Sequence, residues 1–125
     1  MAIKGLTEES TDVLDEAAAS RAAACLFRGM ADPSRVAIMR HLLLGEHNVS
    51  QLTAHLGLAQ STVSKHLACL RDCGLVESRA SGRSSLFSLT HPATVLKVFS
   101  AAEELLAATG DSVVLCPTFG EGARR

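Results

Sequence analysis

The stretch 57–76, GLAQSTVSKHLACLRDCGLV, decides the fold of this chain. Val63, Leu67 and Leu70 recur at the spacing of one helix face, and Gly74 stands where a left-handed helix terminator belongs. Short polar and basic side chains fill the start of this predicted helix, which is typical of the DNA-reading helix of a helix-turn-helix. The candidate DNA contacts are Gln60, Ser61, Thr62, Ser64 and Lys65.

The same predicted helix carries two cysteines, Cys69 and Cys73, four residues apart. Residues at this spacing share a helix face, with Cβ atoms roughly 5–6 Å apart. That is too wide for an unstrained disulfide, which needs about 3.5–4.5 Å. It suits two thiolates that bind one soft metal ion, each at about 2.3 Å or a little more. The negative end of the helix dipole should raise the pKa of Cys73, which makes a reactive redox thiol less favoured. We therefore expect both cysteines to be metal ligands.

The other elements follow from apolar spacing and stop signals. Asp32 and Pro33 predict a helix start, and Ser50 is expected to cap the next, short helix. The predicted order is helices over 11–30, 34–44, 50–56 and 60–73, strands over 75–79 and 85–89 joined by a turn at 81–82, and a last helix from Pro92 ended by Gly110. The fold class is mainly α with a small β-hairpin. Residues 1–10 are expected to be a flexible arm, 11–110 one winged helix-turn-helix domain that binds DNA and dimerises through its first and last helices, and 111–125 a tail.

Composition excludes several classes of protein. The 125 residues fit one domain, and 47% are hydrophobic, which argues against disorder. With four Phe and neither Trp nor Tyr, base stacking on single-stranded nucleic acid is poorly supported. Neither a membrane span nor a signal peptide is predicted, so we expect the cytoplasm, where four cysteines favour thiols or metal ligands over disulfides. The sequence contains no catalytic constellation, and we expect no enzyme.

The net charge of −1 is low for a DNA-binding protein, but the charges are unevenly distributed. Basic residues exceed acidic ones between Ser61 and Thr90: Lys65, Arg71, Arg79 and Arg83 against Asp72 and Glu77. A patch of modest positive charge is enough for a small dimer. Arg83, beside Gly82 at the tip of the predicted hairpin, is a candidate phosphate or minor-groove contact.

Three segments carry a family resemblance: ADPSRVAIMRHLL (31–43), VSQLTAHLGLAQSTVSKHLACLRDCGLV (49–76) and GRSSLFSL (82–89). Together they resemble the ArsR/SmtB family of metal-responsive winged-helix repressors, over about residues 20–108. The pair Cys69 and Cys73, with Cys116 beyond the last helix, resembles the CmtR-type cadmium and lead sensors within that family. Ala59 departs from the pattern, because the family often has a Ser or Thr cap there, worth about 1 kcal/mol of helix stability.

The resemblance implies Cys69, Cys73 and Cys116 as metal ligands, with Cys116 from the same or the partner chain. A third sulfur would complete a trigonal thiolate set, which selects soft cations. Cd(II) or Pb(II) is the expected effector, with Hg(II), As(III) or Zn(II) also possible. Cys25 is expected to be a packing residue, and His66 is expected to have a structural or DNA-facing role.

The sequence thus predicts a homodimeric repressor that binds double-stranded operator DNA in the apo state and releases it on binding metal. Three alternatives stay open. One is a mercury- or arsenic-responsive repressor of the same family. A second is a thiol redox-sensing regulator, in which Cys69 or Cys73 pairs with Cys116 or with the partner subunit. The third is a metal-buffering protein, which the polar start of the reading helix argues against.

Overall fold

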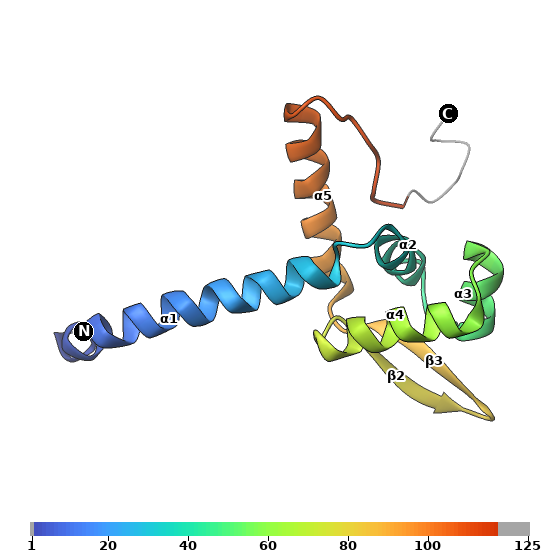
Figure 1. Ribbon diagram of the computed structural model, residues 1–125, viewed down its shortest axis with the longest axis horizontal. Helices are drawn as coiled ribbons and strands as arrows, with labels where there is room; N and C mark the ends of the chain where they lie inside the picture. Colours follow the sequence, from blue (N-terminus) through green and yellow to red (C-terminus); the bar gives the residue numbers. More distant parts are fainter. Residues whose placement is uncertain (1, 118–125) are drawn as a thin grey trace.

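The computed structural model describes the backbone of residues 2–117 and the side chains from Asp15 onward. Five helices and a small antiparallel sheet make a winged helix-turn-helix, which confirms the predicted fold class (Figure 1). The elements are α1 (Ala2–Gly29), α2 (Pro33–Leu42), β1 (His47–Asn48), α3 (Val49–Leu56), α4 (Gln60–Asp72), β2 (Val76–Ser81), β3 (Ser84–Leu89) and α5 (Pro92–Ala108).

Helix α1 begins earlier than predicted. The sequence indicated a flexible arm over residues 1–10, but the backbone is helical from Ala2. This part of the chain has no proline, and its single glycine, Gly5, is tolerated inside a helix at a cost of about 1 kcal/mol. The surrounding Ala, Lys, Leu and Glu residues favour helix, so nothing in the local sequence forces a break before Thr11.

The caps of α2 and α3 differ in how well they were predicted. Asp32 is the N-cap of α2, where its carboxylate accepts from the backbone N–H of Ser34 at 2.7 Å, as expected. The N-cap of α3 is Asn48 and not Ser50. Asn48 and Gln51 form a reciprocal capping box, with hydrogen bonds of 2.8 and 2.7 Å. The correct cap lies two residues earlier because only there does a Gln stand at the third helical position.

Helix α4 has a weak start and a strong end. Its N-cap, Ala59, has the extended backbone of a cap and makes no side-chain hydrogen bond. At the other end Gly74 adopts φ +78°, the left-handed conformation that was predicted. The Leu75 N–H donates to the Leu70 carbonyl at 2.9 Å, and the Gly74 N–H donates to the Arg71 carbonyl at 2.9 Å. These two bonds form a Schellman motif, which turns the chain directly into β2.

The sheet contains one more strand than the sequence indicated. Strands β2 and β3 pair antiparallel, and Ser81 faces Ser84 across a turn at Gly82 and Arg83, one residue later than predicted. Gly82 has φ +62°, as the first position of a two-residue hairpin turn requires. The two-residue strand β1 adds to the other edge of β3, giving the order β1-β3-β2. So short a strand leaves no periodic pattern in the sequence.

The core lies where α2, α3 and α4 meet the sheet and the start of α5. Its buried residues are Ile38, Met39, Leu42, Leu52, Val63, Leu67, Leu70, Val76, Phe87, Leu89, Val95 and Phe99. The inner face of α4 is therefore buried in the core, while its outer face is accessible to solvent. This division fixes which side chains of α4 can reach a ligand.

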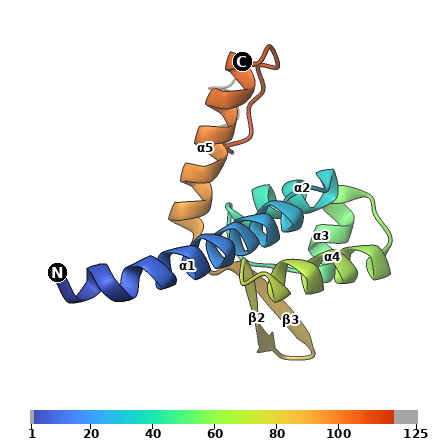
Figure 2. The same cartoon turned by 60° about the vertical axis from the view of Figure 1, so that its left-hand side comes forward.

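Helices α1 and α5 project away from this core in different directions (Figures 1 and 2). Both carry apolar side chains in water: Phe27 is 62% exposed and Leu105 is 66% exposed. An apolar groove of about 350 Å³ lies between the two helices, lined by residues that include Phe27, Val98 and Leu106. No helix among residues 2–117 is long and apolar enough to cross a bilayer.

The uncapped start of α4 predicts a stabilising substitution. Ala59→Ser places a hydroxyl at a backbone that already has cap geometry, so the free energy of unfolding should rise by about 0.5–1 kcal/mol. Ala54→Ser, in the exposed middle of α3, is the matched control and should lower stability by a few tenths of a kcal/mol. Urea denaturation of both variants measures the difference. If Ala59→Ser were no more stable than the Ala54→Ser control, the cap assignment would be wrong.

Candidate nucleic-acid interface and thiol site

The first two turns of α4 present a polar face to solvent. Gln60, Ser61, Ser64 and Lys65 are exposed, and Thr62 is half-buried. Val63, in the same turns, is fully buried and holds this part of the helix in the core. The five predicted DNA contacts therefore lie at the start of a helix whose orientation is fixed by packing. This is the arrangement in which a recognition helix presents side chains to base edges and phosphates.

The wing extends this polar face. A groove of about 340 Å³ separates the start of α4 from the hairpin, and its lining includes Ser50, Gln60, Arg83 and Ser85. Exposed Arg83 lies at the hairpin tip, so the predicted wing contact and the predicted helix contacts border one groove. The hydroxyl, amide and guanidinium groups that line this groove can donate hydrogen bonds to phosphate oxygens.

The charge of Arg79, which was counted in the predicted basic patch, is neutralised by an ion pair. Arg79 makes two hydrogen bonds of 2.9 Å to the two carboxylate oxygens of Glu46. The hydrogen bond from Arg79 holds the pKa of Glu46 below its usual range, so the pair stays ionised at neutral pH. The charge count along the sequence missed Glu46, which lies outside the segment counted but folds against β2. The positive charge of the interface therefore rests on Lys65 and Arg83 more than on Arg79.

Arg35, in the first turn of α2, connects that helix to the end of α1 and to the middle of α4. Its guanidinium donates to the Gly29 carbonyl at 2.6 Å and to the Arg28 carbonyl at 2.9 Å, which satisfies the last carbonyls of α1. A third guanidinium nitrogen lies 3.3 Å from Nδ1 of His66 on α4. The other ring nitrogen of His66 lies 3.8 Å from Asp32, the cap of α2. In this structure His66 therefore has the structural role rather than a DNA-facing one.

The C-terminal end of α4 meets α1 through sulfur. Sγ of Cys73 lies 3.3 Å from Sγ of Cys25, and 3.5 Å from the Cys25 carbonyl oxygen. The hydrogen bond to Cys25, followed by burial and by the nearby Cys25 and Cys69 sulfurs, raises the pKa of Cys73 to about 11. Cys73 is therefore a thiol at neutral pH unless a cation displaces its proton. Sequence spacing gave no sign of this contact, because 48 residues separate the two cysteines.

Cys116 lies in the C-terminal tail, which packs against α5 and α2. The carboxylate of Glu103 on α5 accepts from the backbone N–H groups of Leu115 and Cys116 at 2.6 and 2.7 Å, and Arg40 on α2 donates to the Leu115 carbonyl at 2.9 Å. Sγ of Cys116 lies 3.4 Å from the Ser100 hydroxyl on α5. Figure 1 shows the tail running back from the end of α5 toward α2. The tail thus packs on the protein, against α5 and α2.

The three predicted ligands do not converge within one chain. Between residues 15 and 117, the one set of three potential metal ligands whose donor atoms all lie within 4.8 Å of one another consists of histidines. Cys69 on α4 and Cys73 at its C-cap are both half-buried, and Cys116, in the tail, is half-buried beside α5. The structure therefore brings Cys73 together with Cys25, and it leaves Cys116 beside Ser100.

A helix with an exposed polar start, a preceding helix joined to it by a glycine turn, and a hairpin beside both define a winged helix-turn-helix DNA-binding protein. Residues 32–78 match the profile of the arsR family of bacterial regulatory proteins. A probable mercury resistance operon repressor of Streptomyces lividans is 37% identical over 101 residues, 79% of this chain and 79% of that relative. The chain belongs to the ArsR family, whose members are transcriptional regulators and not enzymes.

Two further comparisons agree with this assignment. The transcriptional regulator CmtR of Mycobacterium tuberculosis is 50% identical over 68 residues, which cover 54% of this chain and 58% of CmtR. The crystal structure of NolR from Sinorhizobium fredii superposes with a TM-score of 0.66 at 31% identity, over 73% of this chain and 90% of NolR. The likeness to CmtR thus covers little more than half of each protein, whereas the likeness to NolR extends over most of the fold.

The interface makes a direct prediction for DNA binding. Lys65→Ala removes an exposed cation from the start of α4, so operator affinity should fall and the salt slope of binding should decrease by about one. Ser64→Ala should weaken binding as well, with little change in the salt slope. Fluorescence anisotropy on the protein's own promoter, at several salt concentrations, measures both quantities.

The matched control is Lys97→Ala, which removes the same charge from an exposed position on α5. It should leave the salt slope unchanged, because α5 lies outside the interface. Unchanged operator affinity in both the Lys65 and the Ser64 variant would exclude α4 as the reading helix.

Proposed function

We propose that this protein is a metal-sensing transcriptional repressor. In this account it binds operator DNA as a homodimer in the apo state and releases the DNA when a soft thiophilic metal binds to cysteine thiolates. The observation that carries the proposal is the dual use of α4. Its first turns present the polar face, and its last turns carry Cys69 and Cys73, with Cys73 against α1. An ion held at one end of a rigid helix acts on the other end.

The dimer is supported by unpartnered apolar surface on α1 and α5. Phe27 and Leu105 are more than half exposed, and the groove between the two helices is almost entirely apolar in its lining. Exposed apolar surface of this kind marks an interaction site. A two-fold dimer through these helices would set the distance between two copies of α4, which a palindromic operator reads as half-site spacing.

The choice of metal follows from the donor atoms. Thiolates are soft ligands, and they select soft cations over hard ones such as Mg(II). The relative from Streptomyces lividans is named for mercury resistance, and the chain also resembles CmtR. Cd(II) and Pb(II) are the proposed effectors, with Hg(II) as the first alternative and As(III) and Zn(II) after it.

The third ligand has two candidates. Cys25 is nearest, because its sulfur already lies 3.3 Å from that of Cys73. Cys116 is held on α5 by the bonds from Glu103, so it would have to come from the partner subunit or leave its place beside Ser100. Either ligand would connect the end of α4 to a helix of the proposed dimer interface. Binding would then change the angle of α4 relative to that interface.

The release step needs only a modest free energy. A coupling of about 1–3 kcal/mol between the two sites changes operator affinity by about 5- to 150-fold. In the apo state, Arg35 and the Cys25–Cys73 contact hold α1 and α4 in one relative position. Deprotonation of Cys73 by the metal removes the proton that its thiol donates to the Cys25 carbonyl oxygen, so the apo position loses one of its supports. The two copies of α4 would then no longer match the half-sites.

A thiol redox regulator is the second candidate, and the distance between Cys25 and Cys73 favours it. Oxidation of these two thiols by hydrogen peroxide would give a disulfide and two water molecules. The high pKa of Cys73 opposes it, because the thiolate is the nucleophile in this step. Thiol titration separates the two functions: metal protection is reversed by a chelator, whereas a disulfide is reversed only by a reductant.

The metal hypothesis predicts the behaviour of single serine variants. Cadmium should produce ultraviolet sulfur-to-metal charge-transfer absorption with up to three thiolates per protomer. Cys69→Ser and Cys73→Ser should each abolish cadmium-driven release of operator DNA, while apo-protein binding persists. Gel shifts with and without cadmium measure this, and release at wild-type cadmium levels by both variants would refute the proposal.

Cys25→Ser and Cys116→Ser form the matched pair that identifies the third ligand. The charge-transfer band should fall by roughly a third in the variant that lacks a true ligand and stay unchanged in the other. Loss of intensity in Cys116→Ser alone would support the set Cys69, Cys73 and Cys116. Loss in Cys25→Ser alone would move the site onto α1.

A further inference from the structure

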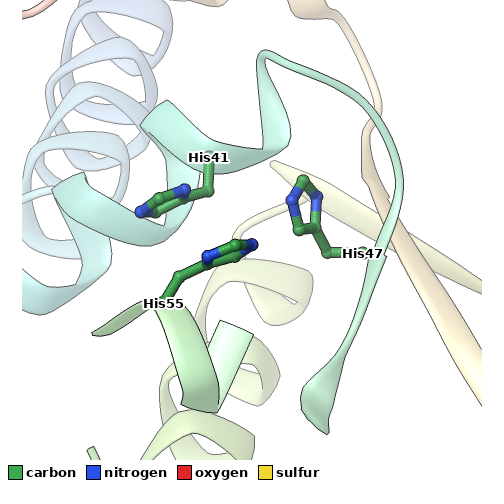
Figure 3. Close-up of side chains that lie close together, drawn as sticks. All are labelled: His41, His47 and His55. Atoms are coloured by element: carbon green, nitrogen blue, oxygen red, sulfur yellow. The ribbon is translucent and has the colours of Figure 1, made fainter. Parts of the chain in front are cut away.

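Three histidines from three separate elements converge on one side of the helix-turn-helix. His41 comes from the last turn of α2, His47 from β1 and His55 from the last turn of α3. Figure 3 shows the three rings facing one another across the space between these elements. One ring nitrogen from each lies within 4.8 Å of those of the other two.

The three rings lie close together, and no carboxylate among the described residues forms an ion pair with them. The rings of His41 and His55 stack with centroids 4.9 Å apart and an interplanar angle of 6°. The ring of His47 meets both edge-on, at 6.1 and 5.5 Å. Packing alone does not require three nitrogen donors at this point.

The tautomer of His47 is set by the backbone. Its Nδ1 lies 2.8 Å from the carbonyl oxygen of Gly45, and because a carbonyl only accepts, Nδ1 must carry the proton. In the neutral ring, Nε2 is then left with a free lone pair. A hydrogen bond from the second ring nitrogen to a backbone carbonyl is the usual support of a metal-binding histidine.

The surroundings of His41 favour its neutral form. Its half-buried position, and then the neighbouring His55, His47 and Arg40, lower the pKa of this imidazole below its ordinary value. A neutral imidazole has the lone pair that a metal needs, and no proton has to be displaced from it at neutral pH.

We propose that His41, His47 and His55 form a binding site for a borderline divalent transition metal, Zn(II) in the first place, separate from the thiols of α4. Imidazole nitrogens suit such ions better than the soft cations that thiolates select. Three ligands at about 2.0–2.1 Å in a tetrahedral site are about 3.3–3.4 Å from one another. The three nitrogens lie within 4.8 Å of one another, and the Cβ–ring torsions have broad minima, so small ring rotations would bring them to that spacing. The fourth position stays open to water beside exposed His55.

Such an ion would clamp the DNA-binding unit. His55 lies on α3, two residues before the glycine turn that leads toward α4, and His47 pairs with Phe87 of β3 in the wing. A bound ion would therefore hold the first helix of the helix-turn-helix and the inner edge of the wing against α2. The histidine site would therefore stiffen the fold near the start of α4, whereas the thiols lie at the C-terminal end of α4.

The test uses the full-length protein and Zn(II) itself. Ring nitrogens of all five histidines are followed by long-range ¹H–¹⁵N NMR as Zn(II) is added. The signals of His41, His47 and His55 should shift together with saturation at one ion per protomer, while those of His91 stay in place. Because NMR reports on each ring, Zn(II) bound at the thiols does not obscure the result.

Variants provide the second measurement. His47→Gln and His55→Gln should each weaken Zn(II) binding at least tenfold and abolish the Zn(II)-dependent rise in Tm that this site supplies. His91→Gln, at the exposed N-cap of α5, is the matched control and should behave as wild type. Both substituted residues lie at least partly in solvent, so the variants should fold, which circular dichroism checks.

Two results would overturn the proposal. One is the absence of any change in the three ring signals with Zn(II) in excess. The other is wild-type Zn(II) affinity at the histidine signals of both the His47 and the His55 variant. Cadmium-driven release of DNA should be retained in these variants, so failure of the histidine site and failure of the thiolate site give different outcomes.

Discussion

The close contact between the end of α1 and the end of α4 is the constraint on which the rest of the structure depends. Gly29 is buried there, and a Cβ added to it would lie 3.2 Å from Sγ of Cys73 and 3.7 Å from its Cβ. A side chain at position 29 would press on Cys73, whose sulfur would have to shift by a few tenths of an ångström. Arg35 completes the joint by binding the last carbonyls of α1 and the ring of His66 on α4. These contacts fix the direction of α1 relative to the direction of α4.

In the proposed mechanism, this contact is the route by which sulfur chemistry at the end of α4 would affect DNA binding at its start. Leu67 and Leu70 bury the middle of the helix, so α4 moves as a rigid body or not at all. Gly74 ends it in a tight Schellman turn, which leaves Cys73 as the C-cap of the helix. A ligand that changes the spacing of Cys73 from α1 changes the direction of the whole helix.

Much of the fold could be predicted from local sequence because its signals are local. Asp32 with Pro33, the apolar spacing of α4 and the glycine at position 74 each specify an element boundary by their own chemistry. The errors occur where local signals are weak or absent. Strand β1 exists only because β3 offers it an edge, and the start of α1 has no break to mark it. Ser50 is a plausible cap by residue type, but the reciprocal capping box of Asn48 and Gln51 starts α3 two residues earlier.

The candidate sites depend still more on tertiary structure. The polar start of α4 could be identified from its residue types alone. The contact of Cys25 with Cys73, the pairing of Arg79 with Glu46 and the cluster of His41, His47 and His55 could not, because each joins elements far apart in the sequence. The spacing of Cys69 and Cys73 identifies two thiols on one face. In the proposed site, the third ligand would depend on how α1, the tail and the partner subunit of the proposed dimer are arranged around that face.

The central claim is that metal at the thiols of α4 and DNA at its polar face oppose each other through this helix. Linkage makes the claim measurable from the metal side, because two coupled sites affect each other by the same factor. The direct measurement is the cadmium affinity of the protein, by competition with a chelating indicator, in the absence and in the presence of saturating operator DNA. The account predicts that operator DNA weakens cadmium binding by the same factor, about 5- to 150-fold, by which cadmium weakens operator binding. An identical cadmium affinity with and without operator DNA would contradict it.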